Sequence, residues 1–219
     1  MRLAVARPWT WVSIAAPSRD RQFQAYNRSM SASRRILRIV LKPTDEWDLI
    51  AGEETSIDVL LRRYILPLSL LAPIATVIGM KVFDASWDPG QGYLVAPQDI
   101  FAAGATTLFT AISSVFLLAG IFVIIAPLYD SSRNYRSALK VATFGAVPLL
   151  LAGATLVLPV MVIVGLIGLC HSLFLYWMGA HRVLNVRREH QAEFVGISML
   201  LLVFVSTLAG AAASAAGLF

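Results

Sequence analysis

The side chain best placed for chemistry in this sequence is His171, near the middle of an apolar stretch that contains no charged residue. An ionisable group at membrane depth is costly unless it is paired, so such groups are functional candidates by default. Two interpretations are open. His171 is either a proton relay or ligand contact, working with hydroxyl groups of the apolar stretch 101–126, or a neutral imidazole that hydrogen-bonds a neighbouring helix. The absence of Asp and Glu from every apolar stretch favours the second interpretation.

The remaining reactive side chains do not form the pattern of an active site. Ser172 adjoins His171, but adjacent residues of a helix point to different faces. His181 and His190 are separated from His171 by membrane depth or by loop, and Cys170 is the only cysteine, so no metal site is expected. Phosphate-binding, zinc-protease and serine-hydrolase motifs are absent. The sequence predicts a protein that is not an enzyme and that has no catalytic residues, metal or cofactor.

A second candidate site is the acidic stretch PTDEWDLIAGEE, residues 43–54. Thr44 can cap a short helix that carries acidic residues in its first turn, and Trp47 is then expected to face the membrane. Capping does not account for Glu53 and Glu54, which form either a structural ion-pair network or a patch for a protein partner. The arginines considered for the network are Arg62, Arg63, Arg133, Arg136, Arg187 and Arg188. Trp47, Glu53, Glu54 and His171 are therefore the candidate interaction residues.

These side chains belong to a strongly apolar chain. Of its 219 residues, 58% are hydrophobic and 14% are charged, and the mean hydropathy of +0.71 is too high for a soluble domain of this size. A helix needs about 20 apolar residues to cross a hydrocarbon core of about 30 Å. Five stretches meet this requirement: 64–80, 101–126, 139–158, 160–180 and 194–216. We expect an all-α, polytopic membrane protein with five transmembrane helices.

The basic residues indicate the orientation of these helices. All of the eighteen Lys and Arg residues except Lys81 fall before the first span, between the second and third, or between the fourth and fifth. Basic loops stay on the cytoplasmic side, so we expect a cytoplasmic N-terminus, an outer C-terminus and a location in the inner cell membrane. Because the basic residues are spread over loops, the expected partners are anionic lipid headgroups, not nucleic acid.

Three regions are expected along the chain. Residues 1–33 are predicted to be a disordered or mis-annotated N-terminal extension. Residues 34–63 form a cytoplasmic amphipathic segment, because RRILRIVLKP alternates basic and apolar residues as helices on anionic membrane surfaces do. A capping box is expected at Thr55. Residues 64–219 form the membrane domain, in which Pro67 predicts a kink and the short connection at Pro159 predicts a hairpin of the third and fourth spans.

Residues 35–79, RILRIVLKPTDEWDLIAGEETSIDVLLRRYILPLSLLAPIATVIG, resemble the opening of bacterial members of the Yip family, the Ypt/Rab-interacting membrane proteins. The resemblance rests on Pro43, Glu46, Trp47, Tyr64, Ile65, Pro67 and Leu68 among others, and continues in ALKVATFGAVPLLLAG, residues 138–153. It implies the same five-helix, N-inside layout. The Asp-Leu-Tyr-Gly-Pro motif of eukaryotic relatives is absent, so Rab binding is not implied for this chain.

The resemblance implies a non-enzymatic membrane protein. The function expected from it is a membrane-organising scaffold or adaptor, with partner or lipid contacts on its cytoplasmic face. The alternative is a small transporter or channel that uses His171 and the hydroxyl groups of the second span.

Overall fold

The computed structural model describes residues 31–82, 87–88, 92–93, 97–157 and 161–215. Within these ranges, five helical segments are long and apolar enough to cross a membrane: Ile57–Lys81, Ile100–Tyr129, Tyr135–Val157, Val162–Leu184 and Arg188–Ala213. The prediction of an all-α protein with five membrane-length helices is confirmed. Its N-terminal extension, apart from residues 31–33, lies outside the described residues. Between the first two spans, β1 (Trp87–Asp88) and β2 (Gly92–Tyr93) form one short antiparallel pair.

The first span is irregular around Pro67. It begins with α4 (Ile57–Leu60), widens into the π-helix η1 (Leu61–Ile65), and continues as α5 (Leu66–Ser69) and α6 (Leu71–Val82). A proline ring clashes with the carbonyl four residues earlier, and a π-turn gives that carbonyl room. The amide of Leu66 accordingly donates to Leu61, five residues back. The expected kink therefore takes the form of a π-turn, and the span starts at Ile57, before the predicted boundary.

The third and fourth spans form the predicted hairpin. The third consists of α8 (Tyr135–Gly145), α9 (Val147–Ala152) and the 3-10 turn η3 (Gly153–Val157), and the fourth is α10 (Val162–Leu184). α10 packs along both α8 and α9. Glycine lets the third and fourth spans approach each other closely at two positions. Gly145 of α8 lies against the ring of Tyr176 of α10, and Gly168 of α10 lies against Ala152 of α9. This hairpin is the centre of the bundle.

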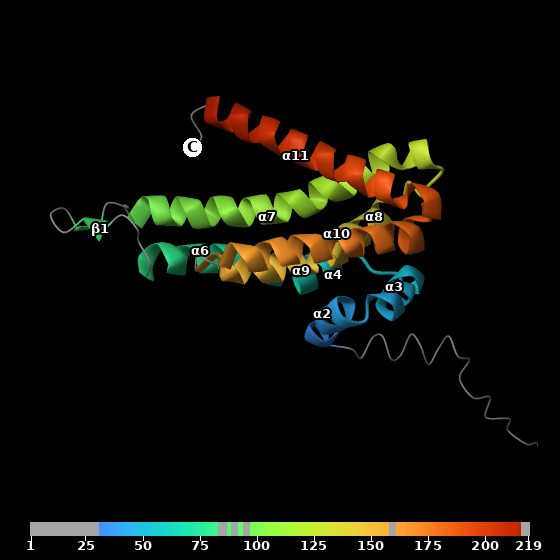
Figure 1. Cartoon of the computed structure of the whole chain (residues 1–219), viewed down its shortest axis with the longest axis horizontal. Coiled ribbons are helices and arrows are strands. Elements are labelled where there is room, and N and C mark those ends of the chain that lie inside the picture. Colours follow the sequence, from blue (N-terminus) through green and yellow to red (C-terminus); the bar gives the residue numbers. More distant parts are fainter. Residues whose placement is uncertain (1–30, 83–86, 89–91, 94–96, 158–160, 216–219) are drawn as a thin grey trace, which may run out of the picture. The chain divides into compact units, whose positions relative to one another are not determined.

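The second and fifth spans complete the bundle. The second is α7 (Pro97–Ile125) with the 3-10 turn η2 (Ala126–Tyr129), and the fifth is α11 (Gln191–Ala215), preceded by η5 (Arg188–His190). α7 packs against α6 and α8, and α11 against α7 and α10. Figure 1 shows α11 leaving α7 toward its C-terminal end, where its side chains become exposed. Phe122 and Phe194 stack, with ring centroids 5.3 Å apart, where α7 and α11 meet.

Two short helices precede the spans, α2 (Ala32–Leu41) and α3 (Pro43–Gly52). Pro43 separates them, because the residue before a proline is disfavoured in the helical region. The predicted caps are wrong by one or two residues. Lys42, not Thr44, precedes α3, which begins with Pro43 itself, and the hydroxyl of Ser56, not Thr55, accepts the amide of Val59 at the start of α4. α3 packs against α10, and α2 contacts both α3 and α9.

Candidate functional site

Arg35 ties the two short helices together. Its Nε atom donates to Oε1 of Glu46 over 2.8 Å, and a terminal guanidinium nitrogen donates to Oε2 of Glu53 over 2.6 Å. Nε of Arg38 forms a further ion pair with Oε2 of Glu46, at 2.9 Å. The side chain of Glu46 is 0% exposed. A buried carboxylate between two guanidinium groups holds α2 against α3, and we call these four residues the buried ion-pair cluster.

The pKa of Arg35 agrees with this geometry. Burial of the guanidinium lowers the pKa, but the charges of Glu53 and Tyr64 and the hydrogen bonds to Glu46 and Glu53 raise it by more, so the pKa lies above its ordinary value. A raised pKa in the folded state means that the stabilisation is complete below the ordinary pKa and is lost only as pH rises through the folded-state pKa. Arg35 therefore remains cationic, and its contribution remains intact, across the physiological range.

Lys140 fastens the end of α3 to α8. Its ammonium group donates to the carbonyl oxygens of Ile50, over 3.0 Å, and Glu53, over 2.8 Å. The last carbonyls of a helix have no partner within the helix and carry partial negative charge, so a cation is favoured there. Lys140 is itself buried. The sequence counted Lys140 with the basic residues between the second and third spans, although the predicted span 139–158 begins one residue before it; the structure places it inside the third span, where it caps α3.

Trp47 is fully buried, and the prediction that it faces the membrane is wrong. Its exposed fraction is 0%, and it meets the ring of Phe144 edge-on with centroids 6.5 Å apart. The indole lies over Gly179 of α10, where a Cβ atom would approach its Cη2 atom to 2.8 Å. A larger residue at position 179 would exclude the ring. Trp47 is therefore a packing anchor, and no external partner reaches it.

The pair Glu53 and Glu54 has two different environments. Glu53 belongs to the buried ion-pair cluster, so the structural alternative holds for it, although its partner is Arg35 and none of the arginines predicted from the sequence. Glu54 is exposed and forms no ion pair or hydrogen bond with a described residue. Arg62 pairs instead with Asp58, at 2.7 Å, and Arg187 with Asp130, at 3.3 Å. Only Glu54 remains available for an external contact.

A polar cavity opens beside Glu54. Its volume is about 570 Å³, and polar atoms make up most of its surface. Its walls come from the end of α3, from the linker that joins α3 to α4, and from Asn134 with the first two turns of α8. The lining residues are Ala51, Gly52, Glu53, Glu54, Thr55, Ser56, Asn134, Arg136, Ser137 and Lys140. We call it the linker cavity, and it is more polar than the two other cavities described below.

His171 does not join the hydroxyl groups of the second span. Thr106, Thr110 and Ser114 line a cavity of about 710 Å³ between α7, α9 and α10, and His171 is not part of its lining. The Nε2 atom of His171 is buried without a hydrogen-bond partner among the described residues, and its ring meets that of Phe174 edge-on. Neither the predicted relay nor the predicted hydrogen bond to a neighbouring helix is present in the part of the chain described.

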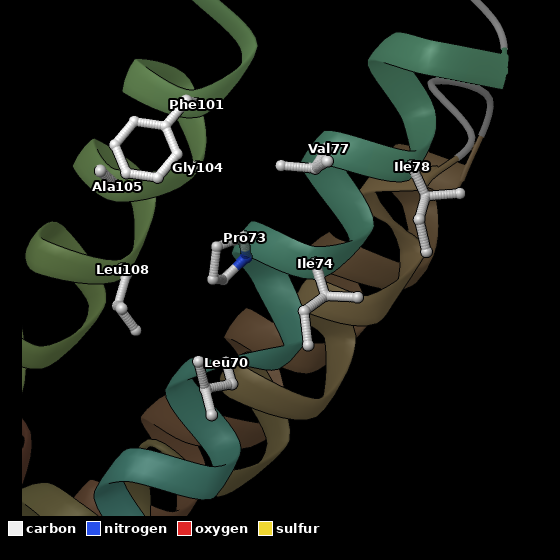
Figure 2. Close-up of a pocket in the computed structure, with 9 residues that line it drawn as sticks. All are labelled: Leu70, Pro73, Ile74, Val77, Ile78, Phe101, Gly104, Ala105 and Leu108. Atoms are coloured by element: carbon white, nitrogen blue, oxygen red, sulfur yellow. The ribbon is translucent and has the colours of Figure 1, made fainter. Parts of the chain in front are cut away.

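A third cavity lies between α6 and α7. Figure 2 shows that its lining consists of hydrocarbon side chains from both helices, with Pro73 and Val77 facing Gly104. Its volume is about 400 Å³. Phe101, Ile74 and Ile78, which line it, are exposed. With no polar side chain in its walls, this cavity offers space but no chemistry.

Comparison with known proteins identifies the family. The family model for the Yip1 domain matches residues 37–210. This chain belongs to the Yip1 domain family. The matched region starts inside α2, just after Arg35, and ends inside α11, so it contains the other three residues of the buried ion-pair cluster, the linker cavity, the first four spans and most of the fifth. Searches of curated proteins and of solved structures found no match.

The sequence pointed to the right segment of the Yip1 domain but not to its key partners. Glu46, Trp47, Glu53 and Glu54 all lie in PTDEWDLIAGEE. From the sequence, Arg35 and Arg38 were expected to belong to a surface amphipathic helix, and Lys140 served only to indicate topology. Two sequence features could have identified them: Arg35 lies four residues from Ile39 on the apolar face of α2, and Lys140 is a single cation within an apolar span.

Proposed function

We propose that this multi-pass Yip1 domain protein is a non-enzymatic, membrane-organising scaffold whose contacts at its charged end are with lipid headgroups. The observation that carries the proposal is the placement of α2. Its inner face, with Arg35 and Ile39, is buried, while Leu37 and Leu41 on the other side are 61% and 74% exposed. Because the buried ion-pair cluster fixes α2, this apolar face is presented in one orientation.

The surroundings of α2 support the proposal that lipid covers this face. α2 contacts α9, which lies within the third membrane-length helix, so α2 runs alongside a part of the chain that lipid surrounds. The exposed Lys42 follows Leu41 directly. Exposed leucines with neighbouring cations are the composition of helices at the boundary between headgroups and acyl chains. A protein partner is less well supported, because Glu54 is the one predicted interaction carboxylate that remains exposed.

Fluorescence quenching in liposomes tests this placement. A probe is attached at Leu41→Cys in a Cys170→Ser background, with Asp45→Cys on the exposed side of α3 as the matched control. Quenchers in the lipid phase are expected to reach position 41, and water-soluble quenchers position 45. Equal access of the water-soluble quencher to both positions would overturn the proposal. Photo-crosslinking of position 41 to a protein in native membranes would replace lipid by a protein partner.

The orientation belongs to the same proposal. We infer an inner-membrane location with the N-terminus in the cytoplasm and the C-terminus outside, supported by the distribution of Lys and Arg over the loops. Reporter fusions at the two ends test it, since a reporter active only in the cytoplasm is expected to work at the N-terminus alone. Activity of that reporter at the C-terminus would reverse the topology.

A small transporter or channel is the second candidate function. The observation in its favour is the cavity of about 710 Å³ that the second-span threonines help to line. His171 is outside that lining, and Thr107 and Ser114 donate to backbone carbonyls of their own helix. Flux into proteoliposomes measures this function, and the pH dependence of any flux is expected to survive His171→Ala.

A further inference from the structure

The linker cavity brings unlike charges to one place. Glu54 lies on one wall, on the linker before α4, and Arg136 lies on the other, in the first turn of α8. Neither side chain forms an ion pair or a hydrogen bond with a described residue, although Glu54 acts electrostatically on Lys140 and both signs of charge face one cavity. Two unpaired charges across a cavity of about 570 Å³ match a ligand that carries both a cationic and an anionic group.

Lys140, which lines the linker cavity, is held in position before any ligand binds. Lys140 is buried, and two of its three ammonium donors are used by the carbonyls of Ile50 and Glu53. The third donor has no partner among the described residues. Ser137, one turn before Lys140 on α8, adds a hydroxyl group to the same wall. Arg136, Ser137 and Lys140 together supply the donors that a phosphate group requires, and Lys140 needs no rearrangement to do so.

The position of the cavity along the chain sets its depth. Its lining residues 51–56 directly precede the first membrane-length helix at Ile57, and 134–140 include the start of the third at Tyr135. Both walls therefore lie where spans enter the membrane, at the level of lipid headgroups. Ile57 and Val59, immediately beyond the linker, are exposed apolar residues that acyl chains can cover.

We propose that the linker cavity binds the phosphate and amine of a phosphatidylethanolamine-type headgroup. Arg136, Ser137 and Lys140 hold the phosphate, and the carboxylate of Glu54 accepts hydrogen bonds from the primary ammonium. The inference deepens the proposed function by naming a lipid class, and it rests on that function only in placing this end of the protein among headgroups. The volume is within the range of about 300–1,000 Å³ that is typical of ligand sites.

The same groups discriminate between lipids. Phosphatidylglycerol has a phosphate but no ammonium, so Glu54 would stay unpaired next to an anionic ligand. Phosphatidylcholine carries a quaternary ammonium, which has no N–H to donate. Charged hydrogen bonds contribute about 1.5–3 kcal/mol, so loss of either end of the headgroup is expected to lower affinity by about tenfold or more.

Native mass spectrometry of the full chain tests this selectivity. The protein is reconstituted in nanodiscs that contain equal amounts of phosphatidylethanolamine and phosphatidylglycerol, then released into detergent, and the lipid retained is identified. The wild type is expected to retain phosphatidylethanolamine, and Arg136→Gln and Glu54→Gln are each expected to lose it about tenfold. Both residues are exposed, so thermal stability of these variants should match the wild type.

The matched controls are Arg133→Gln and Asp58→Asn, which remove the same charges at exposed positions outside the cavity lining. They are expected to retain lipid as the wild type does. Equal retention of the two lipids by the wild type, or equal loss in all four variants, would overturn the proposal. Binding of soluble glycerophosphoethanolamine to lipid-free protein as tightly as the lipid itself would assign the site to a soluble ligand instead of a lipid.

Failure here is distinguishable from failure of the proposed function. The quenching experiment reports the depth of α2 through position 41, which is not part of the linker cavity. If α2 lies in the lipid phase and no headgroup is selected, the scaffold proposal stands and the cavity assignment falls. If the protein retains phosphatidylethanolamine selectively but α2 lies in water, the cavity assignment stands and the scaffold proposal falls.

Discussion

The indole ring of Trp47 and the backbone of Gly179 lie in direct contact, which joins a helix before the first span to the fourth span. A Cβ atom at position 179 would lie 2.8 Å from Cη2 and 2.9 Å from Cζ2 of Trp47, and 3.1 Å from Cγ1 of Val141. α3 approaches α10 this closely because position 179 has no side chain.

Gly179→Ala is expected to destabilise the protein by about 1–3 kcal/mol, because a methyl group overpacks a rigid, buried site. Thermal unfolding in detergent measures the effect. Gly165→Ala is the matched control in the same helix, since nothing lies within 4 Å of its added Cβ. Trp47→Phe should recover part of the loss in the Gly179→Ala background. Equal stability of the two alanine variants would contradict the contact.

Glu46→Gln is expected to be among the most damaging conservative substitutions in the chain. It leaves Arg35 and Arg38 near a neutral group, and removal of one partner from a buried ion pair costs about 3–5 kcal/mol. Asp58→Asn removes an exposed partner of Arg62 and should cost no more than about 1 kcal/mol. The same thermal assay compares the two. A small effect of Glu46→Gln would show that the cluster does not hold α2 in place.

Lys140→Met should loosen the end of α3 while leaving the spans in place. The substitution keeps a similar apolar stem but leaves the carbonyls of Ile50 and Glu53 without a partner, at a cost of about 1–3 kcal/mol. Hydrogen exchange is expected to increase in residues 50–54 and not in α10. Lys81→Met, at an exposed site near the end of α6, is the control. Unchanged hydrogen exchange at residues 50–54 would show that the hydrogen bonds of Lys140 do not hold the end of α3 in place.

His171→Leu is expected to raise stability by about 1 kcal/mol, because it replaces a buried nitrogen that lacks a partner among the described residues. His171→Gln keeps a polar group at the same site and should bring no gain. Thermal unfolding distinguishes these outcomes. A clear loss of stability in His171→Leu would show that the imidazole makes a stabilising contact in the folded protein.

The spans were predictable because transmembrane helices are marked by composition alone, and each predicted span overlaps one of the five helices found. The ends of the spans were less predictable, because the helices continue beyond the apolar stretches into turns that carry charged residues. The first helix begins at Ile57 and the fourth ends at Leu184, both in such turns. The partners in the site were not predictable. Arg35 reaches Glu53 eighteen residues away through a turn, and Lys140 reaches backbone carbonyls 87 and 90 residues away. Lys140 bonds to backbone carbonyl oxygens, so the identities of the side chains at positions 50 and 53 do not reveal the contact.

Trp47 illustrates the same limit. An aromatic residue beside charges suits either a membrane interface or a buried packing site, and the neighbouring sequence is the same in both cases. Trp47 is buried because it packs over Gly179, which lies in the fourth span, far along the chain. Glu53 and Glu54 are adjacent, yet only the fold separates a structural carboxylate from an available one.

The contacts of α3 also set an order for biogenesis. α3 is synthesised before any span, but the residues that receive it, Lys140 of α8 and Gly179 of α10, leave the ribosome only after most of the chain. Until the fourth span is inserted, the indole of Trp47 cannot pack over Gly179. We therefore expect α3 to dock only after the third and fourth spans have both entered the membrane, so that its burial reports their joint insertion.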